Sequence, residues 1–158
     1  MIVKSIERTD IGNCVELGKL LHNESPYYGR SEFNESKLYR LAELCINDPN
    51  YCCFVAQDND DNIIGMIAGV IGTHFFSDCK YSTDITFFVK PESRGSTAAL
   101  RLLTAFCIWS EAMGCDEIRC GVSTGIRIDA ADRIYKKFGF KEEGRLYVMV
   151  PNKDKLVH

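Results

Sequence analysis

The chain has 158 residues, 46 % of them apolar and 26 % charged, a composition typical of a water-soluble globular domain. Its net charge of −3 argues against a nucleic-acid binder, which normally carries a basic face, and there is no run of about 18 apolar residues that would cross a membrane. The N-terminal residues indicate a strand and not a secretory signal. We therefore expect one domain over residues 1–158, in the cytoplasm, with neither nucleic acid nor membrane as a partner.

The first third of the chain predicts a strand followed by two helices. Apolar and polar residues alternate over residues 2–8, as they do in a strand. Thr9-Asp10 then begin a helix with apolar residues three and four apart, and the segment 22–29, which contains Pro and Gly, ends it. A second helix is expected from residue 34 or 35 to residue 46.

The middle of the chain is rich in β-formers. The runs 51–56 and 63–71 are joined by the polar residues 58–62, which is typical of a hairpin. Residues 73–82 indicate an irregular connector, and a further strand is expected from about residue 83 to residue 89. These elements predict antiparallel pairing in this part of the sheet.

The last third alternates helix and strand. Its predicted elements are a helix that ends at Gly114, a strand at 117–122, a helix at 130–138 and a strand at 145–150. The whole order is that of a mixed α/β domain, with one sheet of about six to seven strands and about four helices.

Eight cysteines are present, but none of them form a C-x-x-C pair, and the three histidines are scattered. This spacing predicts no metal site. We expect reduced thiols that act as small apolar residues, although an exposed reactive cysteine stays open.

The stretch 84–103 is the most informative part of the chain. A β-rich run ends at Pro91, a polar turn follows at residues 92–96, and a long apolar-periodic helix then begins. A strand, a Gly-containing turn and a helix direct several unpaired amide groups at one point, where the helix dipole favours an anion such as a phosphate. An ordinary capped helix is the alternative. The nucleotide-binding P-loop and the dinucleotide-binding Gly pattern are both absent.

Two motifs in this half of the chain resemble those of the GNAT superfamily, the acetyl-CoA-dependent N-acyltransferases. The sequence Val89-Lys-Pro-Glu-Ser-Arg-Gly-Ser-Thr-Ala-Ala-Leu-Arg-Leu-Leu103 is similar to the central motif [RQ]-x-x-G-x-[GA], except that Thr97 stands where the middle Gly is usual. The sequence Ala131-Asp-Arg-Ile-Tyr-Lys-Lys-Phe-Gly-Phe140 is similar to A-x-x-x-Y-x-x-x-G-F, but the usual Asn before it falls on Ile128.

The resemblance implies a fold whose fourth and fifth strands splay apart, with acetyl-CoA bound in the gap. The pantetheine arm would pair with the main chain of Phe87, Phe88 and Val89. The diphosphate would bind the turn and the start of the helix, whose residues are Arg94, Gly95, Ser96, Thr97, Ala98 and Ala99. The reaction would be direct attack of a primary amine on the thioester in a ternary complex.

The catalytic residues follow from the same resemblance. Tyr135 matches the tyrosine that protonates the leaving thiolate, against the alternative of a packed core tyrosine. The position of a family glutamate on the fifth strand falls on Ser123, which is no base by itself but would hold a water molecule. Asp84 is similar to the glutamate of histone-acetylating members, against the alternative of a solvated strand-end aspartate.

The acceptor site is expected at the loop after the first helix, where Glu24, Tyr27 and Tyr28 suit a cationic amine. Lys136 and Lys137 lie where they would reach the nucleotide phosphate of CoA, or else form the wet face of a helix. Two other functions compete with catalysis: a non-catalytic acyl-CoA-binding module and an interaction protein without a ligand. A homodimer is a common state, and the sequence leaves it open.

Overall fold

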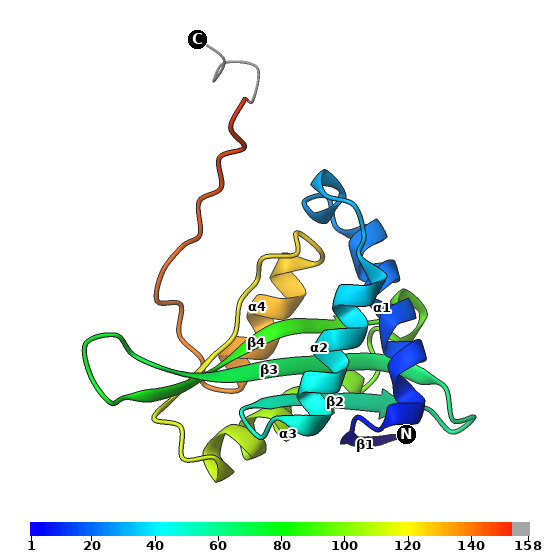
Figure 1. Ribbon diagram of the computed structural model, residues 1–158, viewed down its shortest axis with the longest axis horizontal. Coiled ribbons are helices and arrows are strands. Elements are labelled where there is room, and N and C mark those ends of the chain that lie inside the picture. Colours follow the sequence, from blue (N-terminus) through cyan, green and yellow to red (C-terminus); the bar gives the residue numbers. More distant parts are fainter. Residues whose placement is uncertain (153–158) are drawn as a thin grey trace.

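The structure, a computed structural model, describes residues 1–152 and contains one five-stranded sheet in the order β1-β2-β3-β4-β5 (Figure 1). Neighbouring strands are antiparallel except β4 and β5, which are parallel. The strands are β1 (Ile2–Ser5), β2 (Tyr51–Gln57), β3 (Ile63–Thr73), β4 (Lys80–Val89) and β5 (Glu117–Arg119). The expected mixed α/β class is confirmed.

Four α-helices cover the two faces of the sheet (Figure 1). The helices are α1 (Ile11–Glu24), α2 (Glu35–Asn47), α3 (Ala98–Ala112) and α4 (Ile128–Lys137), with short 3-10 turns at Arg8–Asp10, Tyr28–Arg30 and Pro91–Ser93. Helices α1 and α2 pack on one face and α3 and α4 on the other. No helix among residues 1–152 is long and apolar enough to cross a membrane.

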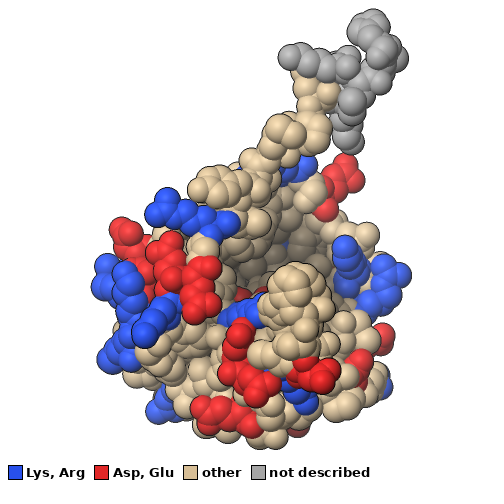
Figure 2. Space-filling model, turned by 90° about the vertical axis from the view of Figure 1, so that its left-hand side faces the viewer, with Lys and Arg blue, Asp and Glu red and all other residues tan. Residues whose placement is uncertain are grey.

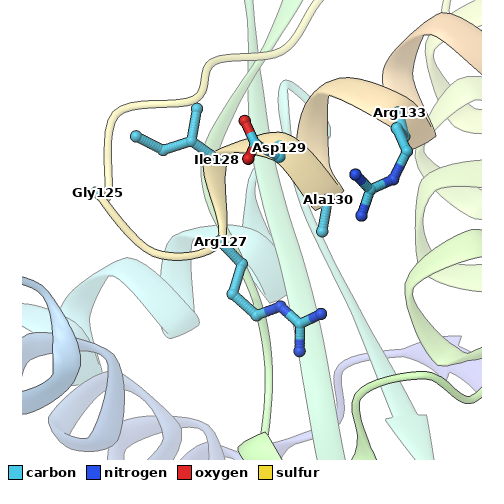
Figure 3. Close-up of a pocket in the computed structure, with 6 residues that line it drawn as sticks. All are labelled: Gly125, Arg127, Ile128, Asp129, Ala130 and Arg133. Carbon is cyan, nitrogen blue, oxygen red and sulfur yellow. The ribbon is translucent and has the colours of Figure 1, made fainter.

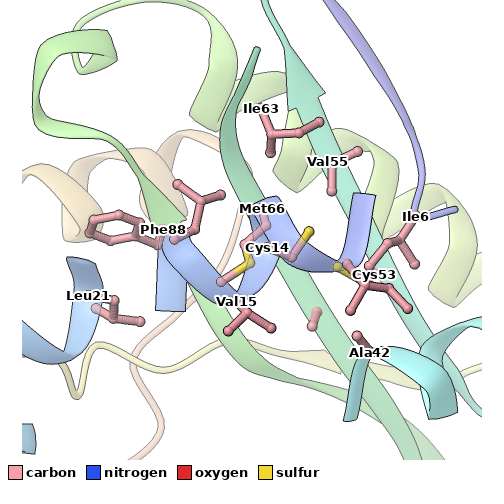
Figure 4. Packing of buried hydrophobic residues seen from close by; sticks show 13 residues of the cluster. Ile6, Cys14, Val15, Leu21, Ala42, Cys53, Val55, Ile63, Met66 and Phe88 are labelled. Carbon is pink, nitrogen blue, oxygen red and sulfur yellow. The ribbon is translucent and has the colours of Figure 1, made fainter. Parts of the chain in front are cut away.

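Each strand contributes to both layers of the core, because alternate side chains point to opposite faces. On β2, Cys53 and Val55 pack toward α1 and α2, whereas Cys52 and Ala56 pack toward α3. Figure 4 shows the first of these layers, where the thiol of Cys14 on α1 lies beside that of Cys53. All eight cysteines are free, and burial raises the pKa of Cys52 to about 12.

A bulge interrupts the pairing of β3 with β4. Ala68 pairs with Thr86 and the next residue, Gly69, pairs with Asp84, so Ile85 is an extra residue on β4. The bulge shifts the alternation by one residue. As a result Asp84 and Phe87, three residues apart, both lie on the face that α3 and α4 cover.

The sheet has five strands and not six to seven, because the expected strand at 145–150 does not form, and the expected strand at 117–122 is shorter than predicted. Strand β5 ends at Arg119 instead of residue 122, since the amide of Gly121 donates to the Asp84 side chain and leaves the ladder. Residues 145–150 form no strand, because they run away from the body of the domain where no other strand is within reach (Figure 1). The connector at 73–82 is shorter than expected, since β3 and β4 extend into a long hairpin.

We expect Gly69→Ala to destabilise the fold by about 1–3 kcal/mol. A Cβ there would lie 2.4 Å from Cε2 of the fully buried Phe106 and 3.0 Å from the Thr83 carbonyl oxygen. The matched control is Gly12→Ala on the exposed side of α1, where the nearest atom is 3.8 Å away, and which should be neutral or stabilising by up to about 1 kcal/mol. Urea denaturation measures both, and equal stability of the two variants would contradict the packing at the bulge.

Candidate functional site

Strands β4 and β5 separate after three residue pairs, the last of which is Thr83 with Arg119. A cavity of about 420 Å³ lies in the gap, a size suited to a small-molecule ligand. Residues 87–89 of β4 form one wall and Val122, Thr124 and Ile126 the other. The turn at residues 93–96 and one side of α4 complete the lining.

Asp84 and Tyr135 lie at the end of the gap where the two strands diverge, and Gly121 holds both. The Gly121 amide donates to Oδ1 of Asp84 over 2.9 Å, and the Tyr135 hydroxyl donates to the Gly121 carbonyl oxygen over 3.2 Å. The Tyr135 ring packs against Phe140, with 5.5 Å between centroids, and faces Phe87 at 6.5 Å. These contacts fix the tyrosine at its ring and at its hydroxyl.

Asp84, Tyr135 and the neighbouring Cys120 form a cluster of titratable groups, and their surroundings set its protonation state. Burial raises the pKa of Asp84 to about 6, and the Gly121 amide offsets only part of that rise. Burial, the charge of Asp84 and the neighbouring Cys120 raise the pKa of Tyr135 above its ordinary value. Burial and Asp84 also raise the pKa of the Cys120 thiol. Near neutral pH the cluster therefore holds one ionised carboxylate beside a protonated phenol and a protonated thiol.

The turn before α3 presents unpaired amide groups. Gly95 has a φ of +87°, which favours glycine, and a Cβ there would meet no atom within 4 Å. The amides of Gly95, Thr97 and Ala99 have no acceptor within residues 1–152, whereas Ala98 donates to the Ser96 hydroxyl. Thr97 has φ −79° and ψ 3°, a conformation open to any L-residue, so its β-carbon adds no strain. The turn is therefore suited to an anion even though Thr97 replaces a usual glycine.

The Arg94 side chain is held within the protein. Its two terminal nitrogens donate to both carboxylate oxygens of Glu24 at 2.5 and 2.7 Å, and its Nε donates to the Val89 carbonyl oxygen at 3.0 Å. The hydrogen bonds from Arg94 hold the pKa of Glu24 below its usual range. The pair joins the end of α1 to the end of β4, so Arg94 fixes the turn while Glu24 balances its charge.

The loop after α1 packs against residues 124 and 125, which precede α4. The buried Ser25 donates its hydroxyl hydrogen to the Thr124 carbonyl oxygen over 2.6 Å and accepts from the amides of Tyr27 and Tyr28. Tyr27 is exposed and packs over Gly125, and Tyr28 is half-buried. None of the three expected acceptor residues lines the cavity itself: the loop contacts the neighbouring residues Thr124 and Gly125, and Glu24 is paired with Arg94.

Of three further expected residues, Ser123 and Lys136 lie outside the cavity and Lys137 lies in its lining. Ser123 is exposed, and it is Val122 and Thr124 on either side of it that line the cavity. Lys136 is exposed and donates to Asp132 one helical turn away, over 2.7 Å. Lys137 lines the cavity. Of the expected catalytic residues, the fold brings together Asp84 and Tyr135 but not Ser123.

Sequence reasoning missed two arginines at the start of α4. Arg127 and Arg133 line both the main cavity and a hollow of about 480 Å³ beside it. Figure 3 shows both guanidinium groups on the same side of the start of α4, whereas the side chains of Ile128 and Asp129 point to the other side. The signal available was the spacing of Arg127, Ala130, Arg133 and Lys137, which are three or four residues apart and so share one helical face. Cys120, beside Tyr135, belongs to no sequence pattern.

The comparisons with known proteins agree with this geometry. The model of the acetyltransferase (GNAT) family matches residues 17–140, and no curated protein matches the chain. The solved structure of AAC(6′)-Iy in complex with the bisubstrate analog CoA-S-monomethyl-acetylneamine has a TM-score of 0.74 at 18 % identity, covering 96 % of this chain and 97 % of that one.

Two other solved structures are similar. The aminoglycoside 6′-N-acetyltransferase AAC(6′)-Ih from Acinetobacter baumannii has a TM-score of 0.72 at 17 % identity, covering 96 % of this chain and 97 % of its own. An acetyltransferase from Trypanosoma brucei has a TM-score of 0.71 at 18 % identity, covering 95 % and 99 %. At these identities the likeness shows the fold.

We expect Glu24→Gln to lower the free energy of unfolding at pH 7 by about 1 kcal/mol, since water reaches part of the Glu24–Arg94 pair. The folded pKa of Glu24 is depressed below its ordinary 4.5, so the pair stabilises above that pH and its contribution disappears as the pH falls through the folded value. The control is Glu16→Gln, which removes an exposed ion pair with Lys19 on the same helix and should cost less. Urea denaturation at pH 7 and pH 3 checks both, and a difference as large at pH 3 as at pH 7 would contradict the ion pair as its cause.

Proposed function

The chain belongs to the acetyltransferase (GNAT) family, and we propose that it transfers an acetyl group from acetyl-CoA to a primary amine of a small molecule or a protein. The observation that carries this proposal is the gap between β4 and β5, with Asp84 and Tyr135 at its closed end and the free amides of α3 at its open end. We propose direct attack within a ternary complex, because no nucleophile in the cluster is ionised other than Asp84.

The residues present fit acetyl-CoA. The amides of Gly95, Thr97 and Ala99 would hold the diphosphate, and Arg127, Arg133 and Lys137 add positive charge along the same cavity. The main chain of residues 87–89 has no strand beside it on the gap side. Arg94 takes the Val89 carbonyl oxygen, and the other main-chain groups on that side would pair with the pantetheine amides as with an added strand. The thioester of acetyl-CoA supplies the activated acetyl group.

In the proposed reaction the protein assists two proton transfers, one from the attacking amine and one to the leaving thiolate. A free amine with a pKa of about 10.4 is mostly protonated at neutral pH, so it needs a proton acceptor before it attacks. Asp84 is ionised above a pH of about 6 and suits that role, directly or through one water molecule. Tyr135 keeps its proton across the working range and suits donation to the leaving thiolate.

The acceptor is proposed as a class and not as one compound. Two of the structural neighbours are named as aminoglycoside N-acetyltransferases, which supports testing aminoglycosides beside polyamines, amino acids and protein N-termini or lysines. The exposed Tyr27 offers a ring face to a cation beside the cavity, although Arg30 stacks on it at 5.3 Å. The eight free cysteines support a reducing compartment, and we propose the cytoplasm.

The proposed function is tested by release of free CoA thiol across an amine panel, together with calorimetric binding of acetyl-CoA. We expect Tyr135→Phe to lower kcat by about 100-fold or more, since general acid catalysis contributes on that scale, and to leave the affinity for acetyl-CoA within about threefold. The ring contacts with Phe140 and Phe87 survive this change. Equal loss of turnover and affinity would contradict the acid role of Tyr135.

The alternative function is a non-catalytic acyl-CoA-binding module of the same fold. It predicts calorimetric binding of acetyl-CoA with no thiol release on any amine of the panel. An interaction protein without a ligand predicts no thermal shift, whereas acetyl-CoA at a hundred times its Kd should stabilise the native state by about 2.7 kcal/mol. Binding and turnover together therefore separate the three functions.

We expect Asp84→Asn to remove the limb of the kcat/KM profile that rises through a pH of about 6, apart from the titration of the amine itself. Asparagine keeps the oxygen that accepts from Gly121 but cannot take a proton. The folded pKa lies above the unfolded value of 3.8, so the native protein loses stability as the pH rises from 3.8 to about 6. At pH 8 the free energy of unfolding of the asparagine variant should therefore exceed that of the parent by up to about 3 kcal/mol before solvent screening, and urea denaturation measures the difference.

An unchanged pH profile with full activity would contradict Asp84 as the proton acceptor. Ser123→Ala is the matched control, because Ser123 is exposed outside the cavity. It should leave both the profile and the stability near those of the parent.

A further inference from the structure

The cavity between β4 and the segment after β5 reaches both faces of the sheet. Among the residues that line it, Phe87 packs in the layer beneath α3 and α4, whereas Phe88 and Leu21 pack in the layer beneath α1 and α2. The free amides at the start of α3 lie on the first of these faces. Acetyl-CoA bound there would leave the second face, beside the end of α1, for the approach of the amine.

Two adjacent residues at the end of α1 hold the two walls of this cavity. Glu24 binds Arg94, which belongs to the turn on the β4 side. Ser25 donates its hydroxyl hydrogen to the carbonyl oxygen of Thr124, a residue of the opposite wall, over 2.6 Å. These contacts join residues 70 and 99 positions apart in the chain. The end of α1 therefore spans the open end of the gap and fixes the distance between its walls.

The Ser25 hydroxyl also fixes the conformation of the loop that follows it. Its oxygen accepts from the amide of Tyr27 over 3.2 Å and from the amide of Tyr28 over 3.3 Å, and Ser25 is only 4 % exposed. A serine hydroxyl has one hydrogen and two lone pairs, so these bonds use its whole capacity. Because the one hydrogen goes to Thr124, the position of the loop follows that of the opposite wall.

The same loop packs directly on the residue after Thr124. Gly125 has a φ of +72°, and a Cβ there would lie 2.7 Å from Cε2 of Tyr27 and 2.8 Å from Cγ of Pro26. Figure 1 shows the loop after α1 and the start of α4 at the same end of the domain. The loop and the opposite wall thus form one close-packed contact, which a single added carbon atom would separate.

Surface charge gives an amine little long-range guidance. On the face that Figure 2 shows, acidic and basic side chains are interspersed, and no large area carries one charge. At the end of α1, the Glu24 carboxylate is already paired with Arg94. Short-range contacts beside the cavity, and not a charged surface, therefore decide where an amine is held.

We propose that Ser25 is a positioning residue for the amine acceptor: its hydrogen bond to Thr124 holds residues 26–30 beside the cavity, where the amine approaches the thioester. The inference rests on the proposed acetyl transfer. Ser25 touches neither substrate and acts through the loop. Its loss displaces the acceptor, while acetyl-CoA keeps its contacts with β4 and with the turn before α3, which Arg94 fixes separately.

The first test is Ser25→Ala, with thiol release measured against amine concentration at saturating acetyl-CoA. The KM for the amine should rise about tenfold, the scale of one lost hydrogen bond, while the calorimetric Kd of acetyl-CoA changes by less than about threefold. Ser25→Thr keeps the hydroxyl and should restore most of the amine KM. The matched control is Ser31→Ala, which removes an exposed hydroxyl that donates to the Tyr28 carbonyl oxygen within the loop and should change neither constant.

The second test separates the same contact from the opposite wall and leaves Ser25 intact. In Gly125→Ala the added methyl group would push Tyr27 and Pro26 off the wall, so the amine KM should again rise without loss of acetyl-CoA affinity. The matched control is Gly29→Ala in the same loop, where a Cβ would meet no atom within 4 Å, and it should behave as the parent.

Urea denaturation of each variant shows that folded protein is assayed, and Gly125→Ala alone decides if Ser25→Ala does not fold. An active parent whose amine KM is unchanged in the folded variants would overturn the positioning role and leave the proposed acetyl transfer intact. The same holds if acetyl-CoA affinity falls as much as the amine KM rises. A parent that releases no thiol with any amine would overturn the acetyl transfer and this role with it.

Discussion

The hydrogen bond from the Gly121 amide to the Asp84 carboxylate determines the rest of the site. In a continued parallel ladder that amide would pair with the main chain of β4, and the sheet would stay closed. Because a side chain takes it instead, β5 leaves β4 after Arg119, and residues 87–89 have no partner strand on the side of the cavity. The carbonyl oxygen of the same glycine receives the Tyr135 hydroxyl. One residue therefore ends the ladder, opens the gap and sets two side chains at its closed end.

Strand β4 is held at both ends of the gap by contacts with other parts of the domain. At one end the extra residue Ile85 keeps Asp84 and Phe87 on the same face, and it turns the Thr86 hydroxyl to the opposite face, where that oxygen is buried without a partner among residues 1–152. A buried hydroxyl without a partner costs about 1–3 kcal/mol in lost hydration, and the surrounding strand pairing must offset this cost of the bulge. At the other end Arg94 bonds the Val89 carbonyl oxygen and Glu24, and this fixes the phosphate-type turn against α1.

Local sequence patterns predicted many of the helix and strand boundaries, whereas contacts between residues far apart in the chain could not be predicted from them. Asn34 caps α2 by accepting from the Lys37 amide, and Gly114 takes the positive φ that ends α3, so both boundaries were predictable. The Arg94–Glu24 pair joins residues 70 positions apart, and the Cys120–Tyr135 contact depends on how α4 meets β5, so neither leaves a trace in spacing. The run at 145–150 was predicted as a strand from propensity alone, but a strand also requires a neighbour, and the chain provides none within the described residues.

The electrostatics of the cluster favour direct transfer over a covalent acyl-enzyme. A cysteine attacks a thioester as the thiolate, and burial beside Asp84 keeps Cys120 protonated. The same ionised carboxylate raises the pKa of Tyr135, so Tyr135 keeps its proton across the pH range in which Asp84 is charged, as the proposed roles require. If Asp84 were better hydrated, it would ionise at lower pH but be a weaker base, and its charge would affect Tyr135 less. Burial of this one carboxylate therefore destabilises the fold and, by the same cause, separates the two roles that we propose for Asp84 and Tyr135.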